Sequence, residues 1–109
     1  MRDRLQSRKC ARYLKALADP DRLKIIQCLR SGPKTVTDLS NMLENDLANV
    51  SHHLGVLRHA GLVRDEKDGK FVVYSLRSEF FPSAAGSETG DTVDLGCCQL
   101  LLGTRQPRK

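Results

Sequence analysis

One segment, residues 46–63 (DLANVSHHLGVLRHAGLV), constrains the fold of this 109-residue chain more than any other. It opens with an aspartate, a residue suited to the N-cap position of a helix. Val50, Leu54 and Leu57 then repeat at helical spacing, and a glycine that is typical of a helix end follows them. The pattern predicts an amphipathic helix over about residues 47–60.

A second short helix is predicted immediately upstream. Thr35 and Asp38 have the spacing of a capping box, so this helix is expected to begin near Val36 and to run to Leu43. Residues 44–45 then form a tight turn. Two short helices joined by a tight turn are typical of a helix-turn-helix, whose second helix lies in the major groove of DNA.

Two strands are predicted after these helices, at residues 62–66 and 71–76. The four residues between them, Lys-Asp-Gly-Lys, contain the Asp-Gly pair that favours a β-hairpin turn. A hairpin placed directly after the second helix is the wing of a winged helix. Upstream, helices are expected over residues 3–18, with Leu14 on an apolar stripe, and from the Asp-Pro pair at 19–20 to the Gly-Pro pair at 32–33.

The expected fold is therefore mainly α with a small β-hairpin wing (α+β), a winged helix-turn-helix over residues 1–81. Residues 82–92 are rich in Ser, Gly, Ala and Thr and are expected to form a linker. Residues 93–109 form a short C-terminal segment with two adjacent cysteines and a basic tail. Apolar residues alternate from Val93 as in a strand, although a helical spacing also fits, and we favour extended structure.

Composition narrows the class of protein. The net charge is +5 and the sequence pI is about 9.3, which weakly favours phosphate backbones as partners. No signal-peptide pattern is visible, and no apolar run approaches the roughly 20 residues of a membrane span. We expect a cytoplasmic protein with no membrane partner, in which four cysteines serve as thiols or ligands rather than as a disulfide framework. No catalytic triad, phosphate-binding loop or cofactor motif is present, so an enzyme is not expected.

Four blocks occur in order: LADPDRLKIIQCLRSG, TVTDLSNML, VSHHLGVLRHAGLV and DGKFVVYSL. Together they resemble the ArsR/SmtB family of winged-helix repressors over about residues 14–76. The resemblance implies a homodimer that binds a palindromic operator in double-stranded DNA and represses transcription. In that family the binding of a metal or metalloid, or the oxidation of thiols, typically releases the DNA.

The chain departs from the family pattern in three places, namely the turn at residues 44–45, the start of the helix that follows it, and the region after Leu76. Glu44 stands where the family usually has glycine, and Asn45 stands where an apolar residue is usual. Leu47 occupies a position that is often polar. No long C-terminal dimerisation helix is evident after Leu76.

The first helical turns after Asp46 carry short or hydrogen-bonding side chains, which allow close approach to DNA and supply donors and acceptors for base edges. The positions that match the DNA-facing positions of the family are Leu47, Ala48, Asn49, Ser51, His52 and Gly55 on the helix and Arg64, Lys67 and Lys70 on the wing. The alternative is a solvated polar face in a winged helix that binds another protein. His52 and His53 point about 100° apart on a helix, so they do not converge on one metal ion.

The cysteines are the candidate sensor. One metal site of the family uses cysteines where this chain has Thr35 and Thr37, and another uses Asp and His on the C-terminal helix, whereas no histidine follows His59 here. Sensing would then depend on the adjacent pair Cys97 and Cys98.

With Cys10 of the same chain or of the dimer partner as a third ligand, these thiols would suit trivalent arsenic or antimony, As(III) or Sb(III), or another thiophilic ion. Zinc prefers four ligands. Two alternatives remain open: a thiol-redox sensor, in which Cys97 or Cys98 pairs with a distant cysteine, and a purely structural role. Cys28 is expected to be a core residue, and Cys10 also fits the apolar stripe of its helix.

Overall fold

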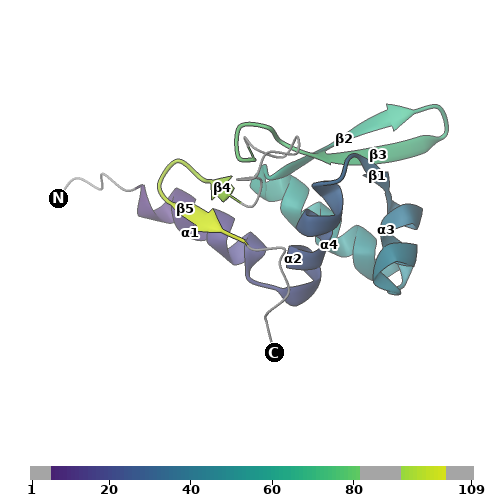
Figure 1. Cartoon of the computed structure of the whole chain (residues 1–109), viewed down its shortest axis with the longest axis horizontal. Helices are drawn as coiled ribbons and strands as arrows, with labels where there is room; N and C mark the ends of the chain where they lie inside the picture. Colours follow the sequence, from purple (N-terminus) through teal and green to yellow (C-terminus); the bar gives the residue numbers. More distant parts are fainter. Residues whose placement is uncertain (1–5, 82–91, 103–109) are drawn as a thin grey trace.

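The computed structural model describes residues 6–81 and 92–102 of the chain (Figure 1). It contains four helices, namely α1 (Ser7–Leu17), α2 (Pro20–Leu29), α3 (Val36–Leu43) and α4 (Leu47–Ala60). The strands are β1 (Lys34–Thr35), β2 (Val63–Asp68), β3 (Phe71–Leu76), β4 (Thr92–Asp94) and β5 (Gln99–Leu101). The winged helix-turn-helix fold, mainly α with a small β-hairpin, is confirmed.

The helix ends follow the capping residues that the sequence displays. Thr35 and Asp38 form a reciprocal capping box at the start of α3, with two hydrogen bonds of 3.1 Å between side chain and backbone. Glu44 ends α3 in the left-handed region, with φ of 53°, a conformation that favours glycine. The family that the sequence resembles usually has glycine here. Glu44 therefore adopts a backbone conformation that is unfavourable for a residue other than glycine.

The sheet joins the wing to the start of α3. β1, β3 and β2 lie in that order and pair antiparallel, with Lys34 opposite Tyr74 and Val63 opposite Leu76. β2 extends to Asp68, two residues beyond its predicted end, because the hairpin closes with a tight turn between Asp68 and Phe71. The resulting wing projects away from the helices (Figure 1).

The core lies between the helices and the base of the wing. Its fully buried side chains are Ile25, Ile26, Leu39, Val50, Leu54, Leu57, Leu62, Val63 and Val93. Leu14, which the apolar spacing placed on the buried stripe of α1, is 38% exposed, so that expectation is wrong. The helix packs through Tyr13, Ala16 and Leu17 instead.

The C-terminal segment is extended, as favoured from its alternating pattern. β4 and β5 form a two-stranded antiparallel hairpin beside α1 (Figure 1). Val93 and Leu95 are buried in the same core as the helices, and the Asp94 amide donates to the Phe80 carbonyl at 2.8 Å. No helix follows β3 in the part of the chain that the structure describes. Residues 3–5 of the first predicted helix, nearly all of the predicted linker and the basic tail lie outside the described residues.

Candidate nucleic-acid interface and thiol cluster

The exposed face of α4 carries most of the predicted DNA-facing positions. Ala48, Ser51 and His52 are exposed, and Leu47 is 52% exposed. The opposite face, with Val50, Leu54 and Leu57, is completely buried. The helix is therefore fixed to the core by one face and presents small polar side chains on the other.

Gly55 lies in the middle of this exposed face. Together with Ser51, His52, Val56 and His59 it lines a shallow hollow on the helix surface. A Cβ atom added at Gly55 would meet no atom within 4 Å. The glycine is therefore not required by packing within the protein.

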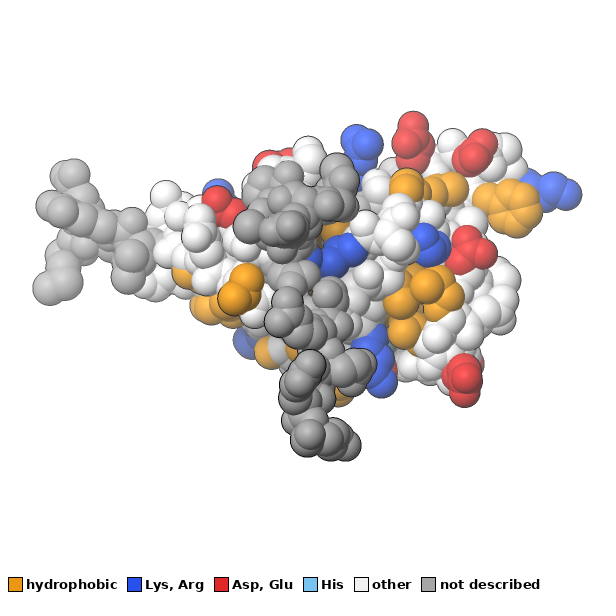
Figure 2. Space-filling view, viewed as in Figure 1, with side chains coloured by type: hydrophobic (Ala, Val, Ile, Leu, Met, Phe, Trp, Pro, Cys, Tyr) orange, Lys and Arg blue, Asp and Glu red, His pale blue; other side chains and the backbone are white. Residues whose placement is uncertain are grey.

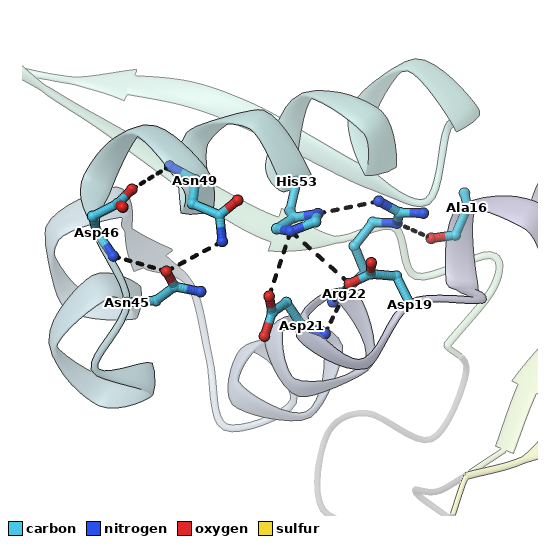
Figure 3. Close-up of polar contacts among 8 residues, drawn as sticks. All are labelled: Ala16, Asp19, Asp21, Arg22, Asn45, Asp46, Asn49 and His53. Carbon is cyan, nitrogen blue, oxygen red and sulfur yellow. Dashed lines mark hydrogen bonds and ion pairs between the residues drawn. The ribbon is translucent and has the colours of Figure 1, made fainter.

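Asn49 differs from its neighbours because it is half-buried and tied to the preceding turn. Its backbone N–H donates to the Asp46 carboxylate at 2.7 Å, which caps the helix. Its side-chain amide donates to Asn45 Oδ1 at 3.1 Å, and the Asp46 N–H donates to the same oxygen at 2.9 Å. Figure 3 shows these three residues grouped at the start of α4.

Sequence reasoning treated Asn45 only as a departure from the family and missed this contact. Asn45 precedes the N-cap Asp46, so the spacing rule for neighbours on a helix surface does not apply to it, and helical periodicity gives no signal for this contact.

His53 connects α4 to α2 and, through Arg22, to α1. It is only 7% exposed, and its Nδ1 lies 3.1 Å from Arg22 Nη1. Arg22 also donates through Nε to the Ala16 carbonyl (Figure 3). Since a guanidinium can only donate, His53 Nδ1 accepts, and in the neutral ring Nε2 carries the hydrogen. Through these contacts His53 and Arg22 together join the three helices α1, α2 and α4.

Two carboxylates face the other side of the His53 ring. Nε2 lies 3.6 Å from Asp21 Oδ2 and 3.9 Å from Asp19 Oδ1. Asp19, Asp21 and His53 lie close enough to share a metal ion. Because Arg22 donates to Nδ1, however, Nε2 has no free lone pair for a metal. We interpret the group as a structural ion network.

Asp19 is also the N-cap of α2. It accepts hydrogen bonds from the Asp21 and Arg22 amides at 2.8 and 3.2 Å. Desolvation alone raises the pKa of its carboxyl group, but these two hydrogen bonds, together with the electrostatic effects of nearby His53 and Arg22, outweigh it. The net pKa of Asp19 is lowered from 3.8.

This lowered pKa predicts a specific acid sensitivity. The charged carboxylate contributes its full stabilisation at pH values above the ordinary pKa of 3.8. This contribution is lost as the pH falls through the pKa of the folded state, which is lower than 3.8. Asp19→Asn keeps an N-cap acceptor but removes the titrating charge. We expect its thermal midpoint to fall less steeply than that of the unmodified protein between about pH 5 and about pH 2. Parallel curves for the two proteins would contradict this assignment.

The basic residues of the wing are exposed but accompanied by acidic ones. Arg64, Lys67 and Lys70 are all exposed. Arg64 Nε also donates to Ser75 Oγ at 3.4 Å. On the face shown in Figure 2, basic and acidic side chains are interspersed over the wing. Phe71 at its tip is 58% exposed.

Three of the four cysteines lie together, although Cys10 and Cys97 are 87 residues apart. Cys10 on α1 forms a disulfide bond with Cys97, and Cys98 Sγ lies 3.5 Å from Cys10 Sγ. All three sulfur atoms lie within 4.8 Å of one another. The structure thus places together, within one chain, the three residues proposed as ligands. The expectation that the cysteines serve as thiols or ligands rather than in disulfides is wrong for Cys10 and Cys97, because the β4–β5 hairpin beside α1 brings their sulfur atoms within bonding distance.

Cys28 lies apart from this cluster. It is partly buried against the core of the protein, as expected. Burial raises the pKa of its thiol, with a smaller opposing effect of Lys34. A protonated thiol is a poor metal ligand and a poor nucleophile.

Comparison with known proteins agrees with this geometry. Residues 19–65 match the family model described as bacterial regulatory protein, arsR family. The chain is 48% identical over 66 residues to the HTH-type transcriptional regulator NmtR of Mycobacterium tuberculosis, covering 61% of this chain but only 55% of NmtR. It is 36% identical over 64 residues to the transcriptional repressor SdpR of Bacillus subtilis, covering 59% of this chain and 71% of SdpR.

Solved structures show the same fold. The homodimeric winged helix-turn-helix DNA-binding domain of Mb0332 from Mycobacterium bovis superimposes with a TM-score of 0.66 at 30% identity. The match covers 72% of this chain and 75% of that domain. No helix in the described parts of the chain is long and apolar enough to cross a membrane. With its four blocks in order, its winged fold and these matches, the chain belongs to the ArsR family of bacterial regulatory proteins.

Proposed function

We propose that this protein is a sequence-specific DNA-binding repressor of transcription that acts as a homodimer on a palindromic operator. The observation that carries the proposal is the face of α4 that remains exposed while the rest of the helix is buried. Its small and polar residues Ala48, Ser51, His52 and Gly55 suit insertion into a major groove. Leu47 and Asn49 flank this face, and Arg64, Lys67 and Lys70 of the wing supply phosphate contacts.

Relatives support repression, DNA binding and the homodimer. SdpR is a transcriptional repressor, and the Mb0332 domain is a homodimer that binds DNA. In a twofold dimer the two α4 helices would enter successive major grooves about 34 Å apart. Such a protein acts in the cytoplasm. Residues 1–81 would bind DNA, residues 82–92 would form the linker, and residues 93–109 would carry the adjacent cysteines Cys97 and Cys98.

Salt dependence tests the proposal directly. A dimer that neutralises six or more phosphates is expected to lose about 1000-fold or more in affinity between 50 and 200 mM salt. The probe is a duplex selected by the protein from a random double-stranded pool, and the readout is fluorescence anisotropy under reducing conditions. A winged helix that serves only as a protein-interaction module would select no sequence and would show no such salt dependence.

We further infer that the thiol cluster of Cys10, Cys97 and Cys98 is the sensor, and that its ligand is trivalent arsenic or antimony. Three sulfur atoms within 4.8 Å suit an ion that takes three thiolates in a pyramid, whereas zinc prefers four ligands. The cluster joins α1 to the β4–β5 hairpin, so ligation would reposition the C-terminal segment against the core. A ligand releases DNA only if it binds the DNA-incompetent state more tightly.

The disulfide bond between Cys10 and Cys97 favours a second candidate, a repressor that responds to thiol oxidation. A hydroperoxide would supply the oxidant: two thiols lose two protons and two electrons to form the bond, and the peroxide is reduced to an alcohol and water. Unchanged DNA affinity after peroxide treatment would exclude this candidate.

A further inference from the structure

We propose that Asn45, in the turn between α3 and α4, is a positioning residue that orients the amide of Asn49 to bind an adenine. The inference rests on the proposed DNA-binding function and names a specificity determinant within it. Asn45 itself need not touch DNA. It acts by fixing which way the Asn49 amide faces.

The orientation of Asn45 follows from its backbone neighbour. The Asp46 N–H lies 2.9 Å from Asn45 Oδ1, and because a backbone N–H can only donate, the oxygen of the Asn45 amide must face it. The same oxygen lies 3.1 Å from the Asn49 side chain. The group of Asn49 that faces an acceptor must be its NH₂. One backbone N–H therefore determines the orientation of both amides.

Asn49 keeps one acceptor and one donor after this contact. Its Oδ1 has no hydrogen bond among the described residues, and its NH₂ group has a second hydrogen. An acceptor beside a donor matches adenine, which presents its N6 amino group and N7 in the major groove. Guanine presents two acceptors there, so the Asn49 oxygen would face another acceptor. The held orientation thus favours adenine over guanine.

The location of Asn49 suits this role. It lies in the first turn of α4, and the N-terminal residues of a recognition helix are those that contact base edges. Its backbone is also held, by the 2.7 Å hydrogen bond to the Asp46 carboxylate. An unrestrained asparagine could rotate its amide and exchange oxygen for nitrogen, whereas here Asn45 selects one arrangement before DNA binds. Figure 3 shows Asn45 and Asn49 facing each other across the start of the helix.

The experiment measures base discrimination rather than affinity alone. The full-length reduced protein first selects its site from a random double-stranded pool. Dissociation constants are then measured for that duplex and for each single base-pair substitution. For Asn49→Ala we expect the preference for adenine at one position of each half-site to fall by about 10-fold or more.

Asn45 is tested with two variants. Asn45→Ala is expected to weaken the adenine preference at the same position by at least about threefold and to leave the other positions unchanged. Asn45→Asp keeps an oxygen for the Asp46 and Asn49 donors, so it should retain the preference. The added negative charge weakens binding to every duplex by the same factor, so it cancels in the ratio of dissociation constants. Thermal unfolding of each variant confirms that it is folded.

Three results would overturn the inference: no change in adenine preference for Asn49→Ala, no change for Asn45→Ala, or an equal loss at every position for Asn45→Ala. The last result would mean that Asn45 only stabilises the turn. If the unmodified protein selects no sequence at all, the proposed function fails instead, and the two failures are distinguishable.

Discussion

Replacing Gly55 with glutamate is expected to weaken operator binding by at least about 100-fold, or about 2.8 kcal/mol, without destabilising the protein. Gly55 lies in the middle of the exposed face of α4, and a Cβ there meets no atom within 4 Å. The free protein therefore has room for the new side chain. In a major groove the same side chain would occupy the space of the base edges and bring a carboxylate close to phosphates.

Gly55→Ala is the matched control. Alanine stabilises a helix interior by about 1 kcal/mol relative to glycine, so this variant should unfold at a higher temperature. Its single methyl group should change operator affinity much less than glutamate does. Anisotropy titrations with the selected duplex and thermal unfolding measure both quantities. Normal binding by Gly55→Glu would show that this face of α4 does not enter the groove.

The helices and the wing could be predicted because their signals are local. Asp19, Thr35 and Asp46 each cap a helix through atoms two or three residues away, and the Asp-Gly pair closes its own hairpin. Such contacts depend little on the rest of the fold. The exposure of Ala48, Ser51 and His52 on α4 follows from the same helical periodicity.

Features that depend on contacts between distant parts of the chain could not be predicted in the same way. β1 has two residues and exists only because it pairs with β3, some 40 positions later. The exposure of Leu14 depends on which face of α1 meets the core, and spacing alone assigned it wrongly. Asn45 departs from the family pattern, but its proposed role depends on where the side chain of Asn49 lies.

The thiol cluster is an intermediate case. The three cysteines could be proposed as ligands because a soft trivalent ion prefers three thiolates. Nothing in the sequence, however, determines the distance between Cys10 and the adjacent pair Cys97 and Cys98. The packing of Val93 and Leu95 into the core explains how the β4–β5 hairpin reaches α1. Burial of two apolar side chains therefore determines the position of the candidate sensor.

The oxidation state of Cys10 and Cys97 is expected to determine whether the protein binds arsenite. In the reduced protein, three thiols displace the three hydroxides of arsenous acid, forming three As–S bonds and releasing three waters. In the oxidised protein, Cys10 and Cys97 are bonded to each other and offer no thiolate, which leaves Cys98 alone. We expect one equivalent of arsenic to bind the reduced protein and none to bind the protein after treatment with peroxide.

Single substitutions test which thiols are ligands. Cys10→Ser and Cys98→Ser should each weaken arsenite binding by about 100-fold or more, since each removes one of three soft ligands. Cys28→Ser is the matched control, because Cys28 lies outside the cluster and should leave binding unchanged. Native mass spectrometry of the reduced proteins counts the bound arsenic, and anisotropy with the selected duplex measures DNA release.

The responses of the variants to arsenite and to peroxide, taken together, distinguish metalloid sensing from sensing by disulfide formation. If arsenite releases DNA from the unmodified protein and from Cys28→Ser but not from Cys10→Ser, the cluster is a metalloid sensor. If peroxide alone releases DNA, and does so only when Cys10 and Cys97 are both present, the disulfide is the signal. Arsenite binding that survives peroxide treatment would contradict the assigned ligands, because two of the three sulfurs would then be unavailable. Each outcome depends on the same fact, that one set of sulfur atoms on α1 and the β4–β5 hairpin cannot be a disulfide and a three-thiolate site at once.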